Sequence, residues 1–434
     1  MSGAQSETSS AEPHRSTRRD EVAELTRRLV AIDATNPSLV PGGAGERDIA
    51  RFIADWLAPR GFEVRLIGAD QDRPSVLARR RGTGGGSTLM LAGHLDTVGG
   101  AGTGSASDAS APDAPDLGAS VQDAAAPDAS DDRLVGRGAY DMAGGLAAAM
   151  VAASAAPADL RGDVVLAFAA DEEFGSLGME ELLEAIDADA HADAEASADH
   201  GPLPDAAVVL EPTDLEVTLA HRGFAWYRVE YEGAAAHGSQ PELGVDAIDR
   251  ATDGLIALRD FGARLEAASR HPLLGTGSVR VATIEGGTDA ATVADRCVLV
   301  VERRTLPGEP DPGAELERVL APSGPARVVA LVARPAMEAD PASQIARAVL
   351  AAVERVTQRT AVRRGDPWWT DAGLLAAAGI PVVLLGAAGG GAHAAEEWVS
   401  TDSLVLLERA IDDVIRAICG ENDQNGGMDE RSRP

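Results

Sequence analysis

The stretch Val164–Gly175, VVLAFAADEEFG, holds an apolar run that ends abruptly in three acids, Asp171, Glu172 and Glu173. A continuous apolar run of this length is typical of a strand that is buried on both faces, as in the parallel sheet of an α/β protein. Ligands and chemistry in such sheets collect at the carboxyl ends of the strands. Three adjacent carboxylates repel one another unless a cation or a proton offsets their charge. Taken alone, however, the three acids also suit the solvated first turn of a following helix.

Two further apolar runs end in side chains that can bind metals. Leu89–Ala92 leads into His94 and Asp96, and Ala206–Leu210 leads directly into Glu211. Residues two apart in an extended chain point to the same side, so His94 and Asp96 can enter one site, with Asp96 placed to orient the imidazole. A lone histidine is more often structural, but here the acids at the other strand ends favour a shared metal site.

Two more candidate ligands lie in glycine-rich stretches. Asp141 stands in GRGAYDMAGG just before an Ala-rich helix, where capping of that helix explains an aspartate equally well. His393 stands in GAAGGGAHAAEEWV, which predicts a flexible loop. Imidazoles and carboxylates without a nearby thiolate form a ligand set that suits Zn²⁺, and also Co²⁺ or Mn²⁺. A carboxylate shared by two ions would place them about 3.5–4 Å apart.

Composition excludes several classes of function. All 38 basic residues are arginine, and against 69 acids they give a net charge of −31, which repels nucleic acid and anionic membranes. No apolar run reaches transmembrane length, and the polar N-terminus lacks the apolar core of a secretory signal. The two cysteines, Cys297 and Cys419, make no disulfide framework. We therefore expect a cytoplasmic protein.

At 434 residues the chain is too long for one ordinary core, so two domains are expected. The first is an α/β domain with a mixed, largely parallel sheet. The second follows a strand–helix–strand–strand–helix–strand order, typical of a small α+β (ferredoxin-like) domain, and it interrupts the first. Ala/Asp-rich stretches and both termini lack the pattern of a packed fold. The expected bounds are a disordered tail at 1–19, a catalytic domain at 20–215 and 334–420, insertions at 101–133 and 187–205, an inserted domain at 216–333 and a second disordered tail at 421–434.

The motifs occur together in one order: GHLDTV, GRGAYDMAGG, a strand ending in DEE, LEPT and GGGAHAAEEWV. In this combination the chain resembles the co-catalytic zinc metallopeptidase and amidohydrolase family of acetylornithine deacetylase, succinyl-diaminopimelate desuccinylase, aminoacylase and glutamate carboxypeptidase. The resemblance covers roughly residues 20–420 outside the two insertions. It implies a zinc-aminopeptidase-like catalytic domain and an inserted domain that mediates homodimerisation and acts as a lid.

The resemblance also implies roles for the acids and histidines at the strand ends. Asp141 would bridge two zinc ions, and Asp96 would orient a histidine ligand. Glu172 would be the general base, which takes a proton from the metal-bridging water and later delivers it to the leaving amine. The implied metal ligands are His94 and Glu211 for one zinc, Glu173 and His393 for the other, and Asp141 for both.

Four residues outside this cluster match family positions that contact the substrate. His237, in AAAHGSQPELGVDA, matches a histidine that reaches across to a partner's active site, where it could stabilise the tetrahedral oxyanion. Arg304, in VVERRTLPGE, is preferred to Arg303 for binding a substrate carboxylate. Thr292 stands where the family often has an asparagine that touches the substrate, and Asp371 matches a position that lines the pocket.

Three functions are compatible with these features. The leading hypothesis is a metal-dependent hydrolase that cleaves the amide bond of an N-acyl amino acid, like a deacetylase or desuccinylase. A dipeptidase or carboxypeptidase on the same scaffold is the alternative, with a short peptide as substrate. A catalytically inactive, metal-dependent binding protein is disfavoured, because Glu172 and every inferred ligand are present.

Overall fold

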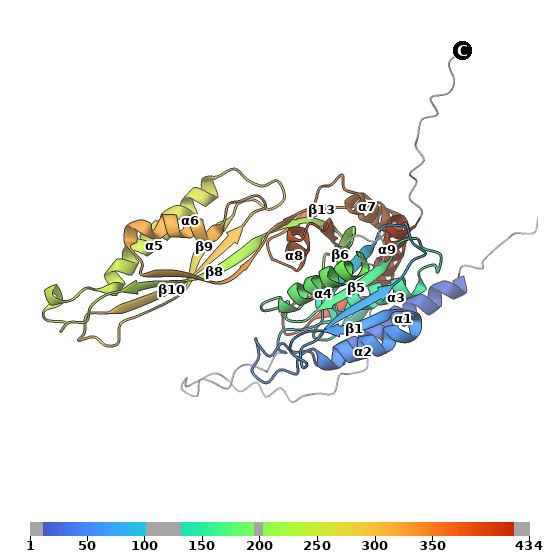
Figure 1. Ribbon diagram of the computed structural model, residues 1–434, viewed down its shortest axis with the longest axis horizontal. Coiled ribbons are helices and arrows are strands. Elements are labelled where there is room, and N and C mark those ends of the chain that lie inside the picture. The colour runs from blue at the N-terminus through green and yellow to red at the C-terminus, as the bar shows by residue number, and fades with distance from the viewer. Residues whose placement is uncertain (1–11, 101–131, 195–202, 421–434) are drawn as a thin grey trace, which may run out of the picture. The chain divides into compact units, whose positions relative to one another are not determined.

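The computed structural model describes residues 12–100, 132–194 and 203–420, which form two compact units (Figure 1). The first unit comprises 12–217, 340–363 and 379–420, and the second comprises 218–339 and 364–378. The expected C-terminal tail at 421–434 lies outside the described residues, as do residues 101–131 of the first expected insertion and 195–202 of the second. The catalytic and lid roles given to the two parts of the chain remain predictions.

The first unit contains a mixed sheet with helices packed on it. In Figure 1, α2 and α4 lie on either side of β1. Its helices are α1 (Glu12–Val30), α2 (Arg47–Leu57), α3 (Gly144–Ala155), α4 (Leu177–Ala194), α7 (Gln344–Thr357) and α9 (Thr401–Cys419), with short turns η1 (Ala58–Arg60) and η2 (Ala139–Ala143). Its strands are β1 (Glu63–Ile67), β2 (Ser75–Arg80), β3 (Leu89–His94), β4 (Arg133–Val135), β5 (Val164–Ala169), β6 (Ala206–Val209), β14 (Val382–Leu384), β15 (Gly389–Gly390) and β16 (Trp398–Ser400).

The order of strands in the main sheet of this unit is β1-β2-β5-β3-β6-β14. Strand β3 runs parallel to β5 and β6, and β6 runs parallel to β14, whereas β1 and β2 are antiparallel to their neighbours. Every residue of β3, β5 and β6 is buried, as their continuous apolar runs predict. The expected mixed sheet is confirmed; it is partly parallel, and its parallel part brings the carboxyl ends of four strands to one edge.

Two helices are longer than expected. Helix α1 begins at Glu12, within the segment expected to be a disordered tail. Helix α4 continues through DADAHADA to Ala194, within the segment expected to be a low-complexity insertion. Alanine has the highest helix propensity of all residues, and the Ala-rich extension of α4 is not interrupted by glycine or proline. A composition that suggested an unpacked spacer therefore also supports a helix.

The glycine-rich stretch that was expected to be a flexible loop begins and ends in short paired strands, with His393 in the loop between them. Strands β15 and β16 pair antiparallel, and β16 pairs with β4 in a small three-stranded sheet. Gly391, at the turn, has a φ of +79°, a conformation that side chains with a Cβ rarely adopt. His393 is thus carried on a hairpin held at both ends.

The second unit is built on a four-stranded antiparallel sheet of order β11-β8-β10-β9. Tyr231 and Val229 of β8 pack with Leu299 of β10 and with Leu258 of α5 in its core. The expected α+β order is confirmed. Its elements are β7 (Val217–His221), β8 (Gly223–Glu232), η3 (Pro241–Leu243), α5 (Ala247–Ala267), β9 (Ser278–Gly286), β10 (Arg296–Thr305), α6 (Pro312–Leu320), η4 (Ala321–Ser323), β11 (Arg327–Arg334), β12 (Met337–Glu338), β13 (Arg363–Asp366) and α8 (Ala372–Ala377).

The described ranges contain no candidate for a membrane-spanning helix. No helix there is both long enough and apolar enough to cross a bilayer.

Candidate metal centre

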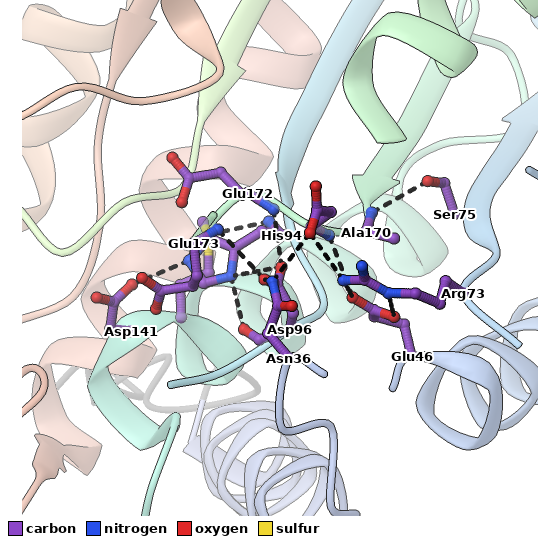
Figure 2. Close-up of polar contacts among 12 residues, drawn as sticks. Asn36, Glu46, Arg73, Ser75, His94, Asp96, Asp141, Ala170, Glu172 and Glu173 are labelled. Carbon is purple, nitrogen blue, oxygen red and sulfur yellow. Dashed lines mark hydrogen bonds and ion pairs between the residues drawn. The ribbon is translucent and has the colours of Figure 1, made fainter. Parts of the chain in front are cut away.

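The predicted ligands of the first unit meet at the carboxyl edge of its parallel strands. His94 is the last residue of β3, where it pairs with Ala169 of β5. Glu172 and Glu173 follow β5 in a turn, and Glu211 follows β6. Figure 2 shows the side chains of His94, Glu173 and Asp141 close together, with the carboxylate of Glu172 directed away from Asp96. Because β5, β3 and β6 are neighbours in the sheet, the side chains at their carboxyl ends lie in one cluster although they are far apart in the sequence.

His94 is buried and held by both ring nitrogens. Nδ1 lies 2.8 Å from the backbone oxygen of Asp96, and Nε2 lies 3.0 Å from Oδ1 of Asp141. The nearest oxygen of the Asp96 carboxylate is 3.7 Å from Nδ1, so the closer orienting contact comes from the backbone. Nδ1 donates to that carbonyl, so in the neutral ring the lone pair is on Nε2 and faces the cluster, whereas the protonated ring donates from Nε2 to Asp141. Burial lowers the pKa of His94, but the hydrogen bond to Asp141 and the charges of Glu211 and Glu172 raise it well above its ordinary value.

The carboxylate of Asp96 instead holds the turn that carries the two glutamates. Its Oδ1 accepts a hydrogen bond from the backbone N–H of Glu172 at 3.0 Å, and its Oδ2 accepts one from Glu173 at 3.2 Å. Asn36 donates to the same Oδ2 at 2.7 Å. Asp96 is buried, and that burial raises its pKa to about 7.

Asp141 lies between two histidines. Its Oδ1 is 3.0 Å from Nε2 of His94, and its Oδ2 is 3.4 Å from Nε2 of His393. The peptide bond from Asp141 to Met142 is cis, and the turn departs from helical geometry at both residues before α3 begins. Burial raises the pKa of Asp141, but the hydrogen bonds from His393 and His94 outweigh it and lower the pKa well below its usual range. A carboxylate with one oxygen toward each histidine suits a bridging role.

His393 faces a second carboxylate. Its Nε2 lies 3.1 Å from Oε1 of Glu173 and 3.0 Å from Oε2. Its side chain is half exposed, unlike that of His94, and its φ of +62° is unusual for a residue with a Cβ. The hydrogen bonds to Asp141 and Glu173 raise the pKa of His393 to about 10.

Two groups of side chains in the described part of the chain have the composition of a metal site. One is His94, Asp141 and Glu211, and the other is Asp141, Glu173 and His393. In each group the ligand atoms all lie within 4.8 Å of one another. Each group offers one imidazole and two carboxylates, the set that Zn²⁺ accepts, and the two groups share Asp141. The residues therefore fit a pair of divalent cations bridged by one carboxylate.

Glu397 supports this arrangement and was not singled out from the sequence. It is buried, and its Oε1 accepts hydrogen bonds from the backbone N–H groups of Tyr140 and Asp141, both at 2.9 Å. Its Oε2 accepts from Gly138 at 2.9 Å and from Arg137 at 2.7 Å. The hairpin that carries His393 thus also fixes the backbone of Asp141. An acid in a glycine-rich stretch gives no periodic signal that would reveal this contact.

The histidine and threonine predicted to contact substrate lie together in the second unit. His237 and Thr292 form an isolated antiparallel bridge. Nδ1 of His237 accepts a hydrogen bond from the backbone N–H of Ser239 at 3.2 Å and lies 2.8 Å from its Oγ. Because a backbone N–H can only donate, Nδ1 is the acceptor and Nε2 carries the ring proton. Thr292 donates to Asp289 at 3.1 Å.

The other two predicted substrate contacts also lie in the second unit. Arg303 is buried and pairs with Glu309 and Glu315 at 2.9 and 3.1 Å, which marks it as structural. Arg304 is partly exposed and pairs with Glu302 at 3.0 Å, so it is the better candidate for an external carboxylate. Asp371 is buried just before α8.

Comparison with known proteins gives one family and several relatives. A family model described as "Peptidase family M20/M25/M40" matches residues 90–417. An acetylornithine deacetylase from Myxococcus xanthus is 30% identical over 298 residues, which cover 66% of this chain and 67% of that protein. A probable carboxypeptidase from Aspergillus terreus is 28% identical over 286 residues, 63% of this chain and 59% of that protein, so the chain matches less than two thirds of the fungal protein.

A similar fold occurs among solved structures. The aminopeptidase PepT from Bacillus cereus superposes with a TM-score of 0.67 and 18% sequence identity, covering 92% of this chain and 98% of that one. At this identity the likeness concerns the fold.

Proposed function

Since the chain belongs to peptidase family M20/M25/M40 and is a metallohydrolase, we propose that it hydrolyses the amide bond of an N-acyl amino acid with Glu172 as general base. The observation that carries this proposal is the pair of ligand groups that share Asp141. The similarity to an acetylornithine deacetylase supports the substrate class.

We propose two Zn²⁺ ions as the cofactor, with Co²⁺ or Mn²⁺ as possible substitutes. Support comes from the YXEP protein of Bacillus subtilis, a structural neighbour described as a dinuclear metal-binding peptidase of family M20. His94 and Glu211 would hold one ion, Glu173 and His393 the other, and Asp141 both. When bound, such a pair of cations polarises the substrate carbonyl and lowers the pKa of water toward about 7.

The proposed work of the protein side chains is proton transfer and charge stabilisation. Glu172 takes the proton of the water that attacks the amide carbon, and it delivers this proton to the leaving nitrogen. His237, with its proton on Nε2, donates a hydrogen bond to the oxyanion. Arg304 binds the substrate carboxylate, since a guanidinium fork matches two carboxylate oxygens. We keep Thr292 and Asp371 as proposed substrate contacts.

A dipeptidase or carboxypeptidase activity is the second candidate. The similarity to a probable carboxypeptidase supports it, and the same residues can cleave a peptide bond. Hydrolysis of a panel of acetyl, succinyl and formyl amino acids and dipeptides by the zinc-loaded chain decides between the two. Turnover of the acyl amino acids alone supports the first proposal, and turnover of dipeptides alone replaces it with the second.

Glu172→Gln tests the role of the base. This variant keeps the shape of the side chain but accepts no proton, so we expect turnover to fall by about 10²–10⁴-fold with two zinc ions retained. Kinetics paired with metal analysis measure both quantities. A near-normal rate in this variant would contradict the role of Glu172, and a wild-type protein that keeps its turnover in EDTA would contradict the metal mechanism.

We further propose that the chain forms a homodimer through the second unit and acts in the cytoplasm. Strand β9 is at one edge of the four-stranded sheet and is largely exposed, which supports pairing with another chain there. Sedimentation velocity tests the dimer, since a monomer at all micromolar concentrations would exclude it.

A further inference from the structure

The turn after β5 carries both the proposed base and a metal ligand, and buried acids hold its backbone. Asp171, at its first position, has a φ of +66°, which is unfavourable for a residue with a Cβ. Its N–H donates to Oε1 of Glu46 at 3.2 Å. The next two N–H groups, of Glu172 and Glu173, donate to the two oxygens of Asp96. Three successive backbone donors are thus each satisfied by a carboxylate.

One guanidinium pairs with two of the three acids that surround this turn. Arg73 donates from Nε to Oε2 of Glu46 at 2.9 Å and from Nη2 to Oε1 of Glu46 at 2.6 Å. The same Nη2 lies 2.9 Å from Oδ1 of Asp171. Glu46 is 0% exposed, Asp171 3% and Asp96 1%, so these acids are shielded from water. Figure 2 shows Arg73 beside the carboxylate of Glu46, on the far side of the turn from Asp141.

Asn36 joins the two halves of this network. Its Nδ2 donates to Oδ2 of Asp96 at 2.7 Å and to Oδ1 of Asp171 at 3.1 Å. Without the guanidinium, the neighbouring buried carboxylates of Glu46 and Asp171 would be uncompensated like charges, whose repulsion would shift the backbone that they hold. The charge of Arg73 therefore helps to hold the backbone of Glu172 and Glu173 in place through these acids. In Figure 2, Arg73 contacts neither glutamate side chain.

We propose that Arg73 is a positioning residue that acts through Glu46 and Asp171 to fix the turn carrying Glu172 and Glu173. This inference rests on the proposed function, because the expected kinetic effect depends on Glu172 being the base. An ion pair that only stabilises the fold is the competing explanation, since breaking any buried pair destabilises a protein. The two explanations differ in what happens to turnover at equal stability.

The chain offers a matched control for this comparison. Arg79 lies on strand β2, which begins two residues after Arg73, and it pairs with the buried Asp163 at 2.6 Å, just before β5 begins. Arg73→Met leaves two buried acids without their cation and Arg79→Met leaves one, at opposite ends of β5. Both variants are studied as zinc-loaded full-length chains, with the best substrate of the panel above. Arg73→Lys, which keeps the charge but lacks the fork, is the milder variant if Arg73→Met does not fold.

Three measurements separate the outcomes: kcat and KM, the urea midpoint, and hydrogen exchange of peptides covering residues 168–177. We expect Arg73→Met to lose about 10–100-fold in kcat with KM within about twofold, and its turn amides to exchange faster. Arg79→Met should lose similar stability but keep its kcat and its exchange in the turn. Arg73→Lys should show a smaller loss of kcat in the same direction.

Unchanged kcat and unchanged exchange of the turn in a folded Arg73 variant would overturn the proposal. Faster exchange with unchanged kcat would overturn the kinetic part, and Glu172→Gln in the wild-type background then shows whether the base itself was misassigned. Unchanged exchange with a lower kcat would also overturn it, because the effect would not pass through the turn.

Discussion

The hydrogen bond from Ser239 to His237 decides what this exposed histidine can do. A backbone N–H aimed at Nδ1 leaves the ring proton on Nε2, so the neutral imidazole presents a donor. A donor is what a developing oxyanion requires, whereas a metal ion requires a lone pair. The residue-scale geometry therefore supports the proposed role of His237 over a role as a ligand through Nε2.

His237→Ala should lower turnover by about 10²–10³-fold, the usual effect of removing one oxyanion donor. Zinc content should stay at the wild-type value, as measured by elemental analysis beside the kinetics. His271→Ala is the control, because His271 pairs with Glu338 in the same unit and has no proposed catalytic role. Loss of zinc in parallel with loss of turnover would instead make His237 a ligand.

His221 gives a prediction of how stability depends on pH. Burial lowers its pKa to about 4, and among the described residues its Nε2 has no hydrogen-bond partner. The unfolded chain binds a proton near pH 6.5, whereas the folded chain does so only near pH 4, so stability falls as pH drops through this window. The full loss amounts to about 3 kcal/mol.

Urea unfolding at several pH values between 4 and 7 measures this contribution. His221→Phe removes the titrating group, so the pH dependence of its unfolding free energy should be shallower than that of the wild type by about that amount. Parallel curves for the two proteins would show that His221 does not carry the effect.

At the scale of elements, the metal centre depends on how closely strand ends approach one another. Gly386, just after β14, lies so near Glu211 that an added Cβ would be 2.0 Å from its carbonyl oxygen. Gly145 of α3 similarly faces the carbonyl of Leu210, at 2.5 Å. Glycine at these positions lets the segment after β14 approach Glu211 and lets α3 approach Leu210, and this close packing places the Glu211 carboxylate.

Gly386→Ala should displace Glu211 and weaken zinc binding by about 10–100-fold. This is the usual loss of metal affinity when a residue that holds a ligand in place is changed. Competition with a chromophoric zinc chelator measures the affinity. Gly262→Ala in α5 is the control, since its added Cβ would meet nothing nearer than 3.5 Å and alanine favours a helix. Wild-type zinc affinity in Gly386→Ala would show that the close approach does not place the ligand.

The sequence predicts the long elements well, because burial on both faces requires continuous apolar runs and amphipathic helices require a period near 3.6. It does not predict β4, β15 and β16, since strands of two or three residues are too short to show alternation. Nor does it reveal Glu397 or the pairing of Arg73 with Glu46 and Asp171. Such contacts join distant segments and depend on the finished fold.

At the scale of the whole molecule, five segments spread from β3 to the hairpin of β15 and β16 supply one centre. A chain with a net charge of −31 gathers further acids there, beside two histidines. Their clustering agrees with the predicted ligands His94, Asp141, Glu173, Glu211 and His393. The predicted contributions of His237, Thr292, Arg304 and Asp371 belong to the second unit, and their roles remain proposals.

Anomalous diffraction at the zinc edge, from crystals of the zinc-loaded protein, tests the central claim most directly. The account predicts two peaks per chain on either side of the Asp141 carboxylate, one beside His94 and Glu211 and the other beside Glu173 and His393. Crystals of Asp141→Ala grown in the same way should lose both peaks. A single peak, or peaks away from these five side chains, would contradict the account.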